Sequence, residues 1–205
     1  TIKIGIPSAI QQSLVSIGML FVISMVNRFG ANATAAFGAA SRIDQLAFMP
    51  AQTFGMAIST LSGQNIGAQK LSRVSQTFRW GAFLSTAITL IPSVLALTVP
   101  HLLLRIFTND TAVIDTGVQY LRIVGFAYVF FAISFASNGV INGAGHTFMT
   151  TIFSLISLWI FRVPLAYYLS QRLNSVQGIW YAMAISFAVS MLVSVIYYAS
   201  GRWKI

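Results

Sequence analysis

Long apolar stretches recur along this chain, and they constrain its fold more than any other feature. The hydrocarbon core of a bilayer is about 30 Å thick, so roughly 20 mostly apolar helical residues are needed to cross it. Stretches of that length occur about six times, which predicts an all-α polytopic membrane protein, a bundle of about six transmembrane helices. The predicted spans form a single lobe over residues 1–205 and cover residues 6–29, 35–62, 80–99, 117–141, 148–169 and 178–200.

The composition excludes several classes of soluble protein. Of the 205 residues, 57% are hydrophobic and only 7% are charged, which is too few to cover the surface of a water-soluble domain. The 12 Lys and Arg residues give a net charge of +9, but they are scattered between the apolar stretches. We therefore expect these cations to meet lipid headgroups of the bilayer, and we expect no nucleic acid as a partner.

The residue types that most cofactor and metal sites need are scarce. There is no cysteine, and the two histidines, His101 and His146, stand far apart without a carboxylate nearby in the sequence. The glycines of residues 63–67 are not followed by the Gly-Lys-Ser/Thr ending of a phosphate-binding loop. We accordingly predict no metal site, no cofactor and no enzyme activity.

Four ionisable side chains fall inside predicted spans, where each is costly without a partner or a water-filled cavity: Arg42, Asp44, Arg122 and Arg162. Asp44 is the only acid within the spans. Because helical residues are about 100° apart, Arg42 and Asp44 lie about 200° apart and cannot pair along one face. We expect Asp44 to pair with Arg122 or Arg162. Two interpretations stay open: a cation- or proton-sensitive group lining a pathway, and a structural ion pair between helices.

Uncharged polar side chains recur along one face of the first and of the fourth span. Steps of four or eleven residues return close to the same angle on a helix. The sets are Gln12, Ser16 and Asn27 in the first span and Ser134, Asn138 and Asn142 in the fourth. Such stripes either form hydrogen bonds across a bundle or line an aqueous cleft.

Motifs near the span ends resemble the multidrug and toxic compound extrusion (MATE) family of transporters. The sequence GQNIGA at residues 63–68, followed by Lys70 and Arg73, is similar to the loop after the second helix of each half of these proteins. The segments at residues 5–7, 27–30, 104–110 and 159–165 also look like this family, and their order matches its second half.

This resemblance implies one lobe of a twelve-helix exporter in the cell membrane, plasma or inner. Its two six-helix lobes would face a central cleft and exchange Na⁺ or H⁺ for small organic substrates, often cationic drugs. The chain would be the carboxyl-terminal lobe, and an amino-terminal six-helix lobe, expected in the same polypeptide, would be its partner. A lipid-linked saccharide flippase of the same superfamily and a non-transporting scaffold remain as alternatives.

The sequence departs from the family at the acids that bind the coupling cation in some members. These members carry a Glu in the first helix of this lobe and an Asp in the fourth, whereas this chain has Gln11 and Gln12 and no acid over residues 121–141. Either coupling belongs to the partner lobe or Asp44 takes that role. The predicted ion and substrate pathway residues are Asp44, Arg42, Gln12, Ser16, Asn27, Asn138 and Arg162.

Overall fold

The chain folds into a bundle of helices. The computed structural model describes the backbone of residues 2–204 and the side chains of residues 12–204, and this part of the chain contains no strand. Four long helices are α1 (Ile2–Asn27), α2 (Ala31–Gly67), α3 (Leu71–Thr98) and α9 (Gln177–Ala199). Two further crossings each join three helical segments: α5 (Thr111–Val124), η1 (Gly125–Ala127) and α6 (Tyr128–Gly143), then α7 (Thr147–Leu155), the π-helix η2 (Ile156–Arg162) and α8 (Val163–Arg172). Two short helices, α4 (Pro100–Arg105) and η3 (Arg202–Lys204), complete the described chain.

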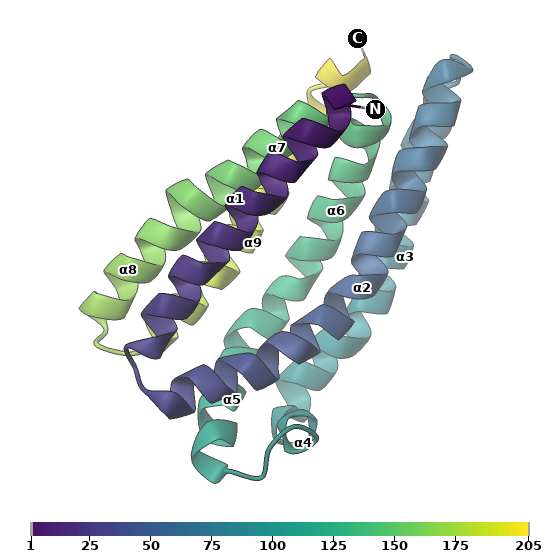
Figure 1. Cartoon of the computed structure of the whole chain (residues 1–205). Coiled ribbons are helices and arrows are strands. Elements are labelled where there is room, and N and C mark those ends of the chain that lie inside the picture. The colour runs from purple at the N-terminus through teal and green to yellow at the C-terminus, as the bar shows by residue number, and fades with distance from the viewer. Residues whose placement is uncertain (1, 205) are drawn as a thin grey trace.

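The bundle has the dimensions of a membrane-spanning protein. Four stretches are long and apolar enough to cross a bilayer, Leu71–Thr98, Thr111–Gly143, Thr147–Arg172 and Gln177–Ala199, and Gln12–Asn27 is a shorter apolar helix. The helix α2 is more polar than these stretches, and it packs beside α3 and α6. Both ends of the described chain lie at the same end of the bundle, as an even number of crossings requires (Figure 1). The prediction of an all-α membrane bundle is therefore confirmed.

The helices extend further than the predicted spans at the polar link over residues 63–73. The helix α2 continues to Gly67 and α3 begins at Leu71, so only three residues form the turn. Gln69 adopts a left-handed backbone conformation (φ 58°), and the Lys70 N–H donates to the Asn65 carbonyl at 2.8 Å, which closes the helix end. Polarity alone does not end a helix; the left-handed residue does.

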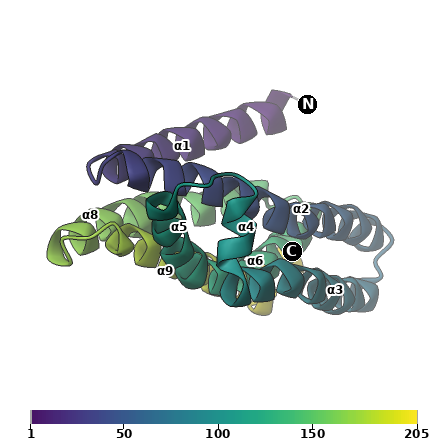
Figure 2. The same ribbon diagram turned by 90° about the horizontal axis from the view of Figure 1, so that it is seen from below.

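Glycines let α2 and α6 pack closely. The helix α6 packs against α2, α3 and α9 and lies near the centre of the bundle when it is viewed from below (Figure 2). A Cβ atom on Gly139 would come within 2.5 Å of the Gly55 carbonyl oxygen, and one on Gly143 within 2.4 Å of the Ser59 carbonyl oxygen. Gly139 and Gly143 are four residues apart on α6, the spacing of a close-contact face in membrane helices.

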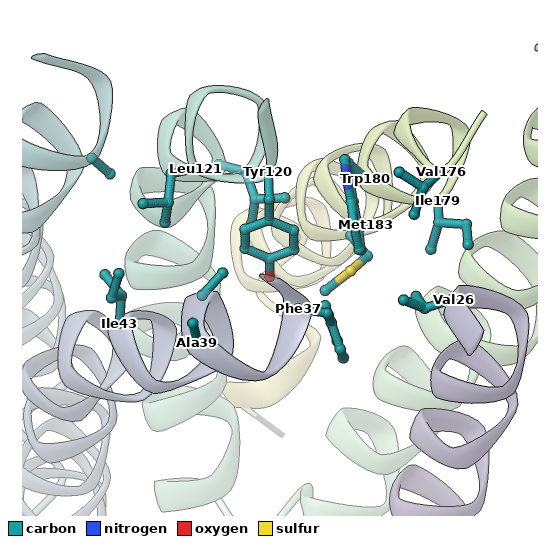
Figure 3. Packing of buried hydrophobic residues seen from close by; sticks show 14 of the residues in the cluster. Val26, Phe37, Ala39, Ile43, Tyr120, Leu121, Val176, Ile179, Trp180 and Met183 are labelled. Atoms are coloured by element: carbon teal, nitrogen blue, oxygen red, sulfur yellow. The ribbon is translucent and has the colours of Figure 1, made fainter. Parts of the chain in front are cut away.

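An aromatic cluster fixes α2, α5 and α9 at one end of the bundle. The rings of Phe37 and Trp180 stack with centroids 5.5 Å apart, and Tyr120 meets Trp180 edge to face at 4.8 Å. Figure 3 shows these three side chains between Val26 on one side and Ile43 on the other. This cluster positions α5 and its continuation into α6, where the polar residues lie.

Candidate functional site

A cleft of about 860 Å³ opens between α1, α2, α6, α7, η2 and α9. Its walls are mostly uncharged polar side chains, with three phenylalanine rings among them. Among the helices that supply its lining residues, α1 and α7 lie to the left and α2 and α6 to the right in the ribbon view (Figure 1). The lining residues are Gln12, Val15, Gln52, Gly55, Met56, Ser59, Thr60, Phe131, Ser134, Phe135, Asn138, Gly139, Asn142, Thr147, Thr150, Ser154, Ser157, Leu158, Arg162, Phe187 and Ser190.

The structure distributes the predicted pathway residues over several places. Gln12, Asn138 and Arg162 line the cleft. Arg42 is exposed and lines a second, smaller hollow of about 380 Å³, where its guanidinium lies 6.0 Å from the centroid of the Phe107 ring.

The other predicted residues lie outside the cleft lining. Asn27 accepts a 2.8 Å hydrogen bond from Thr34 at the junction of α1 and α2, and the Ser16 hydroxyl donates to the Gln12 carbonyl within α1 at 2.9 Å. Asp44 is buried in the packed part of the bundle. The side chain of Gln11 lies outside the described residues.

The polar stripe of α6 both lines the cleft and bonds to neighbouring helices. The Asn138 amide oxygen accepts from Ser194 of α9 at 2.9 Å, and the Asn142 amide oxygen accepts from Thr150 of α7 at 2.7 Å. The Ser134 hydroxyl lies 3.0 Å from that of Ser190. All three stripe residues border the cleft, so these bonds hold its polar wall in one arrangement.

The π-helix η2 brings two polar residues to the cleft that an α-helix would separate. A π-helix forms i to i+5 bonds, so residues five apart fall on nearly the same face, whereas in an α-helix they lie about 140° apart. Ser157 and Arg162 are five residues apart in η2, and both line the cleft. Sequence periodicity missed Ser157 because it assumes α-helical spacing.

Arg162 is held in a fixed orientation. Its Nε donates to the Ser186 hydroxyl at 2.7 Å, and its guanidinium carbon lies 4.6 Å from the centroid of the Phe187 ring. Ser186 is itself anchored, because its hydroxyl donates to the Met183 carbonyl at 2.7 Å and its carbonyl accepts from Ser157 at 2.6 Å. The side chain is thus braced by α9 on the wall of the cleft.

Asp44 takes its hydrogen bonds from tyrosines and not from an arginine. Its two carboxylate oxygens accept from the hydroxyls of Tyr120 and Tyr128, one on α5 and the other on α6. Arg122, one of the two arginines proposed as a partner, is exposed. Arg162, the other, attracts Asp44 electrostatically, but its Nε donates a hydrogen bond to Ser186. The expected direct ion pair is therefore replaced by two tyrosine donors, which a count of charges could not reveal.

The comparisons with known proteins identify the family. A family model described as MatE matches residues 7–168 of the chain. The chain belongs to the MatE family. The resemblance noted in the sequence is confirmed by this match.

Curated relatives carry multidrug resistance names. The chain is 32% identical over 203 residues to a probable multidrug resistance protein, YpnP, of Bacillus subtilis, and 28% identical over 204 residues to a probable multidrug resistance protein, NorM, of Thermotoga maritima. Each alignment covers 99% of this chain but only 45% and 44% of the relative. This MatE chain thus spans about half the length of the curated relatives it matches.

Solved MATE structures share the fold. The structure titled "MATE transporter ClbM in complex with Rb+" matches with a TM-score of 0.89 and 24% identity over 99% of this chain and 48% of that one. A MOP superfamily transporter from Pyrococcus furiosus, described as having a binding pocket of reverse polarity, matches with a TM-score of 0.87 and 19% identity over 96% of this chain and 44% of that one. The six crossings of this chain therefore have the architecture of about half of a MATE transporter.

Proposed function

We propose that this chain is the carboxyl-terminal lobe of a secondary active transporter that exports small organic compounds across the cell membrane in exchange for Na⁺ or H⁺. One observation carries the proposal: a membrane-spanning bundle surrounds an open cleft of about 860 Å³, and most of the residues that line it have polar side chains. Polar side chains are costly at membrane depth unless they are bonded or face water, so an open polar cleft favours a pathway over a packing site.

The size and chemistry of the cleft suit a small organic molecule. Ligand sites of about 300 to 1,000 Å³ enclose drug-sized molecules with apolar surfaces and a few placed polar groups. Phe131, Phe135 and Phe187 supply rings, and Gln52, Asn138 and their neighbours supply hydrogen bonds. In the proposed cycle a second lobe closes the open side, and the two lobes rock to expose the cleft to each face in turn.

Asp44 is the candidate coupling residue of this lobe. It joins α2 to α5 and α6 through two hydroxyl donors, so a change of its charge alters bonds among three helices at once. An incoming H⁺ would convert one of its acceptor oxygens into a donor, and a Na⁺ would compete with the hydroxyls. Either event would bias the packing of α2 against the α5–α6 crossing.

Reconstitution tests the proposal. The chain, together with its proposed partner lobe, is placed in proteoliposomes, and efflux of a fluorescent drug is recorded with a Na⁺ gradient, with a H⁺ gradient and with neither. We expect efflux only with a gradient and only when both lobes are present. Efflux that is indifferent to both gradients, or that this chain produces without the partner lobe, would refute it.

The coupling assignment has its own test. Asp44→Asn keeps the size of the side chain but removes its charge, so we expect at least about a ten-fold loss of gradient-driven efflux, the scale of a modest coupling energy. Asp115→Asn, at an exposed position on α5, is the matched control and should behave as wild type. Full efflux by Asp44→Asn would show that the coupling residue lies in the partner lobe.

A further inference from the structure

The cleft carries a positive charge and no negative one. Arg162 is the only charged residue among its described lining side chains. The chain has just three acids, Asp44, Asp110 and Asp115, and none of them borders the cleft. A cationic compound would find no counter-ion on this wall, whereas an anionic group would find a guanidinium.

Arg162 also has free donors in a suitable geometry. Nε is the only one of its five N–H groups that bonds to the described residues, through Ser186. The planar guanidinium matches carboxylate, sulfonate and phosphate oxygens in a two-pronged arrangement. Because Ser186 and Phe187 already fix the side chain, little conformational freedom is lost when an anion binds.

The nearby carboxylate does not neutralise this site by contact. Both oxygens of Asp44 accept from tyrosine hydroxyls, which lie on α5 and α6. Its attraction to Arg162 acts at a distance, and it stabilises the half-buried arginine without occupying the N–H groups that remain.

Polar and apolar groups flank Arg162 on the cleft wall. Ser157, which also lines the cleft, donates its hydroxyl to the carbonyl of Ser186, the residue that holds Arg162 in place. The Phe187 ring packs under the guanidinium, and Phe131 lies next to Phe187 with ring centroids 5.6 Å apart. With its anionic group at Arg162, an amphipathic organic anion could thus place its apolar part against these aromatic rings.

We propose that this lobe binds the anionic group of its transported compound, a carboxylate, sulfonate or phosphate, at Arg162. The inference rests on the proposed transport function and names the substrate class that its cleft favours. The anion can belong to a soluble organic acid or to a lipid-linked phosphate.

The experiment compares matched dyes on the transporter with both lobes present. Binding of an anionic fluorescein dye, its uncharged ester and a cationic rhodamine dye is measured by fluorescence anisotropy in detergent. We expect wild type to bind the anion at least about ten-fold more tightly than the ester. Arg162→Gln should abolish that preference, Arg162→Lys should retain part of it, and Arg172→Gln, an exposed arginine on α8, should leave it unchanged.

Translocation of a lipid and efflux of the cationic dye complete the test. If the anionic dye does not bind, translocation of a fluorescent phosphatidylglycerol in vesicles is tested; translocation that Arg162→Gln abolishes supports the lipid-linked source. Preference for the cationic dye, or anion binding within two-fold of wild type in a folded Arg162→Gln, overturns the inference. Gradient-driven efflux of the rhodamine dye in the same vesicles separates that failure from failure of the transport function itself.

Discussion

At the scale of single residues, a buried carboxyl is kept in the bundle by its hydroxyl partners. The sequence alone picks out Asp44, because it is the only acid inside an apolar stretch. It does not reveal Tyr120 and Tyr128, which are 76 and 84 residues away and resemble ordinary core or interface aromatics. Long-range pairing of this kind depends on how α2, α5 and α6 pack, and no local pattern encodes it.

Removing one tyrosine hydroxyl should destabilise the bundle measurably. Tyr120→Phe keeps the ring in the aromatic cluster but leaves a buried carboxyl oxygen without a donor, so we expect a loss of about 1 to 3 kcal/mol. Tyr168→Phe, at a position that is 59% exposed, is the control and should change stability by less than about 0.5 kcal/mol. Thermal unfolding in detergent measures both.

A double substitution checks that the effect passes through Asp44. When Asp44→Asn and Tyr120→Phe are combined, the loss of stability should be smaller than the sum of the losses in the two single variants, because the two side chains share one interaction. Strictly additive losses would show that Tyr120 acts through ring packing alone.

At the scale of helices, the sequence predicts the positions of the long helices. It does not predict the polar ends of α2 and α3 or the π-helix. Each predicted span falls on a helical stretch, and four of these stretches are long and apolar enough to cross a bilayer. The predicted spans end too early in α2 and begin too late in α3, because residues 63–67 and 71–79 are polar yet helical. The π-helical hydrogen bonding of residues 156–162 has no periodic signal either. The segment packs against α9, and it places both Ser157 and Arg162 on the cleft.

The contact of α2 with α6 should not tolerate even a methyl group. In Gly139→Ala the new Cβ would overlap the Gly55 carbonyl, a backbone atom that cannot rotate away, so we expect a loss of roughly 1 to 3 kcal/mol. Gly38→Ala, also within a helix but with nothing within 4 Å of its Cβ position, is the control. Detergent melting curves that shift equally for both variants would contradict the close approach.

At the scale of the whole molecule, the fold is more predictable than the cleft. Hydropathy predicts the membrane bundle, because each apolar stretch must be buried in lipid or protein. The cleft depends on how far α1 and α7 stand from α2 and α6. The polar stripe of Asn138 and its neighbours does not predict this separation, because such a stripe either bonds across a bundle or lines an aqueous cleft. The stripe on α6 does both, because its residues form hydrogen bonds with neighbouring helices and also border the cleft.

The central claim is that this polar cleft is a water-accessible pathway inside the membrane, and cysteine labelling tests it most directly. The chain has no cysteine, so Asn138→Cys on the cleft wall and Ile91→Cys, 62% exposed on the apolar face of α3, each provide a single thiol in it. We expect a membrane-impermeant thiol reagent to modify Asn138→Cys rapidly, to spare Ile91→Cys, and to be slowed at Asn138→Cys by a transported compound. Equal resistance of both thiols, or labelling of Asn138→Cys that no compound slows, would contradict the account.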